Sequence, residues 1–333
     1  MSGNVLSCFF PTTVVWVDDD ADSFLDKVVD FIKIPNITFK RFSDPRKAMD
    51  YVNEESGLNN LDCFDLARGG EESTSDWKSI LLNINCLHKE IYSLDRFSRI
   101  STIITDYSMA GMNGVELSAS VMDPNIQKIL LTAIADEMVA INAFNDGLIN
   151  RFMKKEQVDF EGEIKRNVSK SVRQYFRIHT EDISKNLSVY GKTHLRDPIF
   201  ANFFSSICEG KDYVEYYMLD TLGGYLFLDA EGNPSFLCVL TEPEISRVVD
   251  IAIESGEVAQ DILEALQSRE YMLVSHNCSG QLPPLEEWRN YLRPARRLDG
   301  YQTYYFAFGG AESLDLNLAN IKSFDRFCRL SRN

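Results

Sequence analysis

The sequence predicts an α/β domain with a doubly wound, five-stranded parallel sheet, followed by a helical linker and an α+β domain with an antiparallel sheet. Two observations carry this prediction. From residue 12 to 155, short β-branched runs alternate with amphipathic segments, as in strand–helix–strand units. Beyond residue 193, strands follow one another directly and are separated by glycine and proline turn signals. The length of 333 residues fits two domains.

The strands of the first domain are short apolar or alternating runs, predicted at 13–17, 37–42, 101–107, 128–133 and 148–155. The helices have apolar residues at the helical period, predicted at 24–33, 45–52, 115–122 and 136–147. Pro45 suits the first turn of a helix, and Gly147 suits the position after a helix end. Strands that alternate with helices in this order form a parallel sheet.

The link between the second and third strands is longer than this fold requires, so we place an insertion at residues 56–98. Residues 56–77 are loop-like, and residues 79–97 have the pattern of an amphipathic helix. The insertion is either a partner-binding surface or a lengthened connection that packs on the side of the domain.

We expect the domains to span residues 10–157 and 193–333, with a helical linker at 158–192 between them. Apolar side chains in the linker lie mostly four residues apart, as on one face of a helix. The linker is either a connector that dimerises as a coiled coil or a solvated helix followed by a bend. The lack of sustained heptads favours the second interpretation.

The second domain combines helices with a strand meander, an α+β pattern. Its helices are predicted at 196–208, 243–255, 257–269, around 285–292 and at the C-terminus. Its strands are predicted at 213–219, 224–229, 235–240, near 271–275 and at 301–308.

The composition limits the classes of partner. The 50 acidic and 34 basic side chains give a formal net charge of -16, so nucleic acid would bind only at a local basic patch. The 7 cysteines are scattered without a C-x-x-C pair, which fits neither a disulfide framework nor a zinc site. The sequence pattern predicts neither export nor membrane spanning. We expect a soluble, cytoplasmic protein that does not bind membranes.

Polar side chains stand at the carboxyl ends of the predicted strands. Asp18 and Asp19 follow the first strand, Asp106 ends the third, Thr132 the fourth and Lys155 the fifth. Because parallel strands end at one edge of a sheet, these side chains are expected to meet there. Carboxylates without histidine or cysteine suit Mg²⁺, which keeps several waters and leaves room for a phosphoryl oxygen.

A carboxylate accepts a phosphoryl group when cations and hydroxyl donors neutralise the charge that moves with it. Asp106 is the best candidate for this phosphoacceptor. Lys155 would supply the ammonium group, and Thr132 the hydroxyl that follows the phosphoryl group. Mg²⁺ would bind Asp106, Asp19 directly, Asp18 directly or through water, and the backbone carbonyl of Ser108.

The segments VVWVDDD, IITDYSMAGMNGVEL, ILLTA and RFMKK resemble the receiver domain of two-component response regulators over about residues 12–156. The resemblance implies Mg²⁺-dependent phosphorylation of Asp106 by a histidine kinase or phosphotransfer protein. We also expect a homodimer to form on phosphorylation. It also implies that Thr132 moves toward the phosphate while Phe152, an aromatic switch, changes rotamer. In receivers this movement remodels the face made by the fourth helix, fifth strand and fifth helix.

Two positions depart from the family pattern. Ala110 stands where a proline usually follows methionine, and Glu156 stands where a proline usually follows the lysine. Without that proline, a cis peptide after Lys155 would cost about 3 to 4 kcal/mol rather than about 1 kcal/mol. We expect a trans peptide and a slightly displaced Lys155, with Lys154 as the alternative. An inactive receiver with solvated acids is a further alternative, but five matching positions favour a working site.

The second domain offers two weaker signals. Residues 245–270 have the helix–glycine–helix pattern of a helix-turn-helix unit, but acidic side chains on the second helix would repel phosphates. An ordinary pair of packed helices is therefore favoured. A basic patch, which would bind a nucleotide, an anionic ligand or an acidic partner, comprises Arg289, Arg293, Arg296 and Arg297. A solvated helix end balanced by Glu286 and Glu287 is the favoured alternative.

The domain layout has a weaker resemblance to response regulators of bacterial quorum sensing that carry an atypical output domain. The leading hypothesis is a phosphorelay response regulator in which phosphorylation of Asp106 switches dimerisation or partner binding, without an enzyme activity in the output domain. One alternative is a DNA- or nucleotide-binding transcription regulator controlled by the receiver. Another is an output enzyme that acts on a nucleotide.

Overall fold

The computed structural model describes residues 5–20, 34–55, 64–66, 80–82, 89–133, 136–156, 158–189, 193–219, 223–275, 282–310 and 313–331. The helix expected at 24–33 lies outside these residues. The chain forms two compact units. The parallel unit contains Phe10–Asn60, Leu94–Thr180 and Leu330–Asn333. The antiparallel unit contains Met1–Phe9, Leu61–Ser93 and Glu181–Arg329.

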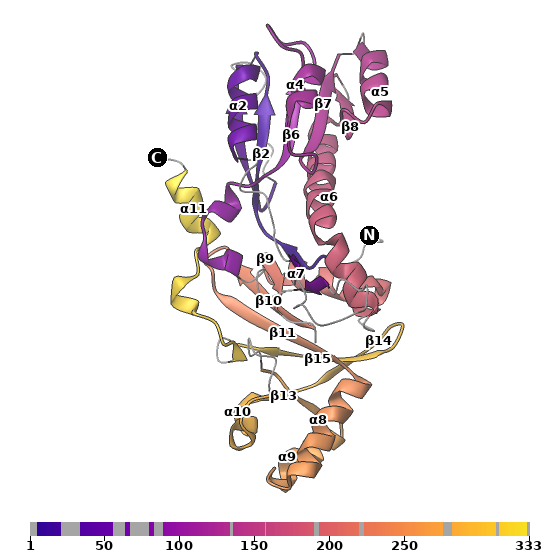
Figure 1. The fold of residues 1–333 in the computed structure, drawn as a ribbon, viewed down its shortest axis with the longest axis vertical. Coiled ribbons are helices and arrows are strands. Elements are labelled where there is room, and N and C mark those ends of the chain that lie inside the picture. Colours follow the sequence, from indigo (N-terminus) through magenta and orange to yellow (C-terminus); the bar gives the residue numbers. More distant parts are fainter. Residues whose placement is uncertain are drawn as a thin grey trace, which may run out of the picture. The chain divides into compact units, whose positions relative to one another are not determined.

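The parallel unit is built on a five-stranded sheet with the strand order β3-β2-β6-β7-β8 (Figure 1). Its strands are β2 (Thr12–Val17), β3 (Ile37–Phe42), β6 (Ile100–Asp106), β7 (Gln127–Thr132) and β8 (Arg151–Lys154). Every pairing in this sheet is parallel. β2 and β6 are buried along their whole length, which explains their unbroken runs of apolar and small hydroxyl residues. The predicted α/β fold class is confirmed.

Four described helices flank this sheet: α2 (Pro45–Glu55), α4 (Gly114–Ser120), α5 (Glu137–Asn145) and α6 (Phe160–Val189). α2 and α4 share a core with the sheet that includes Val17, Val52 and Leu117. α5 packs through Ala140 on a cluster around Leu130 of β7. These contacts fix the loops that follow the strands.

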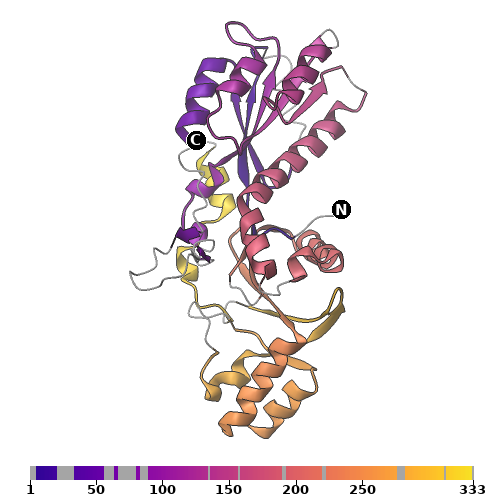
Figure 2. The same cartoon turned by 45° about the vertical axis from the view of Figure 1, so that its right-hand side comes forward.

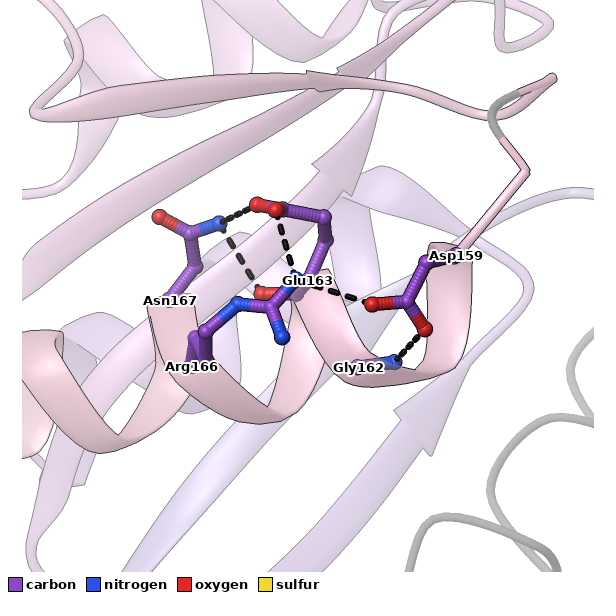
Figure 3. A network of polar contacts seen from close by, with 5 residues as sticks. All are labelled: Asp159, Gly162, Glu163, Arg166 and Asn167. Carbon is purple, nitrogen blue, oxygen red and sulfur yellow. Dashed lines mark hydrogen bonds and ion pairs between the residues drawn. The ribbon is translucent and has the colours of Figure 1, made fainter.

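α6 is one continuous helix of 30 residues, the long pink helix in Figure 2. At its start Asp159 accepts a hydrogen bond from the backbone N–H of Gly162, and Arg166 pairs with both Asp159 and Glu163 (Figure 3). Its apolar stripe, which the sequence predicts, is buried at Ile164, Val168, Val172 and Phe176. Phe176 contacts Phe10 of the same unit, so this part of the stripe is covered without a coiled-coil partner.

The antiparallel unit contains a six-stranded sheet with the order β1-β9-β10-β11-β15-β14. Its strands are β1 (Cys8–Phe9), β9 (Tyr213–Met218), β10 (Gly224–Asp229), β11 (Pro234–Thr241), β14 (Arg296–Asp299) and β15 (Thr303–Gly309). The predicted meander is confirmed as β9, β10 and β11. The edge strands β1 and β14 were not expected from the sequence.

α7 (Pro198–Gly210) packs aromatic side chains on this sheet. The Phe204 ring lies 5.0 Å from that of Tyr225, and Phe203 lies 4.3 Å from Phe306. A second core, centred on the buried Trp288, joins the remaining elements α8 (Glu242–Ser255), α9 (Gln260–Gln267), β12 (Tyr271–Leu273), α10 (Trp288–Tyr291) and β13 (Leu292–Pro294). The C-terminal helix is α11 (Phe324–Leu330). Among the described helices, none combines the length and apolar character needed to cross a membrane.

The described part of the insertion differs from the expected helix at 79–97. β4 (Phe64–Leu66) pairs antiparallel with β5 (Ile80–Leu82), and short 3₁₀ turns follow at Glu90–Tyr92 and Asp95–Phe97. The helix prediction is therefore wrong for these residues. A short apolar run such as residues 80–82 suits a strand or a helix, and here it pairs with residues 64–66 of the same insertion.

Candidate functional site

The predicted acids meet at one edge of the parallel sheet. β2 and β6 pair with Val17 opposite Thr105, so the next residues, Asp18 and Asp106, leave the strands side by side. Asp18 is fully buried, Asp106 is 7% exposed, and Asp19 is exposed. One carboxylate oxygen from each of Asp18, Asp19 and Asp106 lies within 4.8 Å of the other two. This spacing matches a set of ligands for one hard divalent cation.

Lys155 reaches this cluster from the end of β8. Its Nζ lies 2.9 Å from Asp18 Oδ2 and 3.0 Å from Asp106 Oδ1. Lys154 forms an ion pair of 2.8 Å with Glu137 of α5 instead. The geometry therefore favours Lys155 over Lys154. The peptide between Lys155 and Glu156 is trans, and the ammonium still reaches both acids.

The electrostatics leave this cluster short of positive charge. Burial raises the pKa of Asp106, and the charge of Asp18 adds to this, while Lys155 and the Tyr107 N–H oppose it. Burial alone would lower the pKa of Lys155, but hydrogen bonds and charge interactions with Asp18 and Asp106 outweigh burial and raise it. One ammonium group thus serves two buried carboxylates, and a bound cation would relieve their repulsion.

The loop after β6 is held close to the acids. Asp19 Oδ2 accepts a hydrogen bond of 2.7 Å from the backbone N–H of Ala110. A Cβ on Gly114 would collide with the carbonyl oxygen of Asp106, so only glycine allows α4 to start here. Ser108 is exposed in this loop. The Ala110 contact was missed by the sequence analysis because it joins residues 91 apart and depends on a backbone donor.

Asn113 caps the first turn of α4. Its side chain accepts hydrogen bonds from Val115 N and Glu116 N, and Glu116 accepts one from Asn113 N. The pair forms a capping box, whose asparagine-x-x-glutamate spacing is visible in the sequence and would have located this helix start.

The two predicted switch residues lie on neighbouring strands. Thr132, at the end of β7, is buried, and its Oγ1 donates a hydrogen bond of 3.4 Å to the carbonyl of Met153. Phe152 of β8 is partly buried and packs against the cluster of Leu130 and Ala140. Its ring lies 6.4 Å from that of Phe144, which is half exposed on α5. Phe152 therefore contacts the helix that it would have to influence.

Comparisons with known proteins identify the family. No family model matches the chain, and no curated protein matches it significantly. Among solved structures, the chain is similar to the response regulator LqsR of Legionella pneumophila, with 32% identity and a TM-score of 0.81. The alignment covers 99% of this chain and 97% of LqsR. The chain belongs to the response regulator family.

Two other solved structures match parts of this response regulator. An adenylate cyclase from Rhodopirellula baltica is 20% identical over 55% of this chain and 100% of its own, with a TM-score of 0.33. A receiver domain protein from Clostridium thermocellum is 13% identical over 49% of this chain and 95% of its own, also with a TM-score of 0.33. Likenesses of this size carry no information about function.

The four arginines of the response regulator's expected basic patch do not lie on one helix end. Arg289 is on α10, Arg293 on β13, and Arg296 and Arg297 on β14. Arg289 pairs with Asp261 at 2.8 Å, Arg297 pairs with Asp299 at 2.9 Å, and Arg293 donates to the carbonyl of Asn290. The expectation of a helix end is wrong for Arg296 and Arg297, because residues 296–299 form a strand that pairs with β15.

The helix-turn-helix pattern of residues 245–270 is an ordinary packed pair of helices. α8 ends at Ser255 and is capped by Gly256, which has a φ of 65°, and α9 follows. Val249 and Ile262 lie in the core around Trp288. Asp261, on the exposed face of α9, pairs with Arg289, so the acids expected from the sequence are partly neutralised from within the unit.

Proposed function

We propose that this response regulator is a phosphorylation-dependent switch whose phosphoacceptor is Asp106. The convergence of Asp18, Asp19 and Asp106 within 4.8 Å, with Lys155 3.0 Å from Asp106, supports the proposal most strongly. A histidine kinase or phosphotransfer protein would be the donor, because an anhydride-forming acceptor needs an activated phosphoryl group. Family membership supports the same partner class.

Mg²⁺ is the cation that fits the donor set, because three carboxylates without histidine or cysteine prefer a hard ion. The carboxylates of Asp18, Asp19 and Asp106 would hold it, with the carbonyl of Ser108 as a further ligand. When bound, Mg²⁺ supplies positive charge that offsets the phosphoryl oxygens.

In the transfer step, a carboxylate oxygen of Asp106 forms the new P–O bond while the P–N bond to the donor histidine breaks. The donor imidazole leaves with the bonding electrons. Lys155, already 3.0 Å from Asp106, stabilises negative charge beside the new acyl phosphate. Thr132 would then exchange its bond to the Met153 carbonyl for a phosphoryl oxygen, and Phe152 would follow.

The output of the switch is proposed to be a change in dimerisation or partner binding. α6 provides a covalent path, because its residues up to Thr180 belong to the parallel unit and those from Glu181 to the antiparallel unit. We also propose a location in the reducing cytoplasm, because the 7 cysteines of the sequence are scattered without a C-x-x-C pair.

Sedimentation velocity tests this switch with beryllofluoride as the phosphoryl mimic. We expect Mg²⁺ and beryllofluoride together to raise the sedimentation coefficient of the wild-type protein to that of a dimer, and neither to do so alone. Asp106→Asn replaces the carboxylate nucleophile with an uncharged amide and should not respond. A wild-type coefficient that does not change, or an Asp106→Asn protein that dimerises equally, would contradict phosphorylation-dependent dimerisation.

A further inference from the structure

A cavity of about 410 Å³ lies within the antiparallel unit and is lined by Lys211, Pro294, Arg296, Phe306, Ala307 and Phe308. Lys211 directly follows α7, Arg296 begins β14, and the two phenylalanines belong to β15. The volume falls in the range of small-ligand sites. None of these residues belongs to the phosphoacceptor site.

The sheet register explains why a cation and aromatic rings share this cavity. Arg296 of β14 pairs directly with Phe306 of β15, so both side chains lie on one face of the sheet. Phe308 lies two residues further along and occupies the same face. Phe306 is covered by Phe203 of α7, but α7 ends at Gly210 and leaves Phe308 only partly buried.

Two cations border this cavity, and the described carboxylates do not neutralise them as they do several arginines of the unit. Arg269, Arg289 and Arg297 each contact a carboxylate at 2.7 to 2.9 Å. Within the described parts of the chain, neither Arg296 nor Lys211 forms an ion pair with a carboxylate, and both are exposed. Lys211 Nζ instead lies 4.2 Å from the centroid of the Phe308 ring.

Lys211 and Arg296, which have no carboxylate partner among the described residues, border one partly aromatic cavity and together suit an anionic ligand. Acidic side chains of a partner protein would suit cations on a flat surface. A concave site of this size instead suits a small molecule. The apolar wall of Phe308 and Pro294 further favours a ligand with a planar body.

We propose that this cavity binds a nucleoside phosphate. The planar guanidinium of Arg296 binds the phosphate through two parallel hydrogen bonds, and Lys211 adds a second positive charge. The base packs against Phe308 and Pro294. Arg296 contributes more than Lys211, because Lys211 sits at the carbonyl end of α7, where the helix dipole disfavours an anion.

Isothermal titration calorimetry of the full-length protein with AMP and GMP, without Mg²⁺, tests the proposal. We expect saturable binding of at least one nucleotide that weakens as salt is raised. Arg296→Gln should weaken that binding about tenfold or more, since it removes charge-assisted hydrogen bonds, and Lys211→Gln should weaken it less. The exposed Arg289→Gln, which removes a paired arginine of the same unit, is the matched control and should leave affinity unchanged.

Further titrations separate the contribution of the phosphate from that of the nucleoside, and binding in this cavity from binding at the phosphoacceptor site. Inorganic phosphate and adenosine should each bind more weakly than AMP. Asp106→Asn should retain full binding, so this test fails or succeeds independently of the phosphorylation switch. No saturable binding of either nucleotide, equal binding of inorganic phosphate, or an Arg296→Gln protein with unchanged affinity would overturn the proposal. Loss of binding in Asp106→Asn would also overturn it, by placing the nucleotide in the receiver.

Discussion

Asp106 in the receiver and Asp197 in the antiparallel unit are both buried aspartates, yet their surroundings shift their pKa values in opposite directions. Burial raises the pKa of Asp106 more than its partners lower it. Burial also tends to raise the pKa of Asp197, but hydrogen bonds from Tyr301 N, Ile199 N and the Tyr304 hydroxyl outweigh burial and lower it.

The difference separates an acid that holds the structure from the acid that we propose to be reactive. Asp197 caps α7, and donors on all sides stabilise its charge, so it holds the helix against the sheet. The charge of Asp106 shares one ammonium with Asp18 and is left poorly compensated. A bound cation would compensate the charge of a carboxylate of this second kind, and it would also neutralise a phosphoryl group attached there.

Replacing each aspartate should therefore change stability with opposite sign. Asp197→Ala removes the helix cap and leaves buried donors unpaired, so we expect the free energy of unfolding to fall by roughly 3 kcal/mol. Asp106→Asn removes an unfavourable buried charge, so we expect a rise of up to about 1 kcal/mol. Urea unfolding at neutral pH measures both. A destabilised Asp106→Asn protein would break the comparison.

The adjacent lysines test whether the receiver acids depend on one cation. Lys155→Met leaves Asp18 and Asp106 buried without a counter-charge, so we expect a loss of roughly 3 kcal/mol in the free energy of unfolding. Lys154→Met is the matched control, because its ion pair with Glu137 is well exposed, and it should cost less than about 1 kcal/mol. Equal losses for the two variants would show that Lys155 does not hold the cluster.

The pH dependence sharpens the comparison further. Because the folded pKa of Asp106 is raised, its ionisation costs stability as pH rises through that pKa, and this cost is absent below the unfolded pKa. The advantage of Asp106→Asn over the wild type should therefore shrink as pH falls from neutral toward about 4. Urea midpoints of both proteins over this range measure the effect. A constant advantage across the range would refute the raised pKa.

Asp197 should show the opposite trend. Its lowered pKa gives stability above the ordinary value of about 3.9, and this stability is lost as pH falls through the folded pKa. The deficit of an Asp197→Asn protein relative to the wild type should thus persist to lower pH than the Asp106→Asn advantage does. The same urea series provides this measurement.

The sequence predicts the receiver better than the antiparallel unit for a physical reason. Strand–helix alternation places the carboxyl ends of β2, β6, β7 and β8 at one edge, so residues at those ends can be assigned to a site before any contact is known. Asp18, Asp106 and Lys155 converge because each stands at, or directly after, the carboxyl end of one of these strands.

The features that the sequence did not reveal depend on distant partners. β1 has two residues and exists because Cys8 and Phe9 pair with β9, more than 200 positions away. The bond from Tyr304 to Asp197 joins residues 107 apart. Arg296 and Arg297 were placed near a helix end because their strand is short and charged, and only pairing with β15 defines it.

Localising the phosphoryl group gives the most direct test of the central claim that Asp106 is the phosphoacceptor. The full-length protein would be incubated with acetyl phosphate and Mg²⁺, then analysed by intact-mass and peptide mass spectrometry. We predict that the wild type gains a single phosphoryl group on Asp106, that Asp106→Asn gains none, and that Asp197→Asn is labelled like the wild type. Equal labelling of Asp106→Asn, or a phosphoryl group mapped to another residue, would contradict the account.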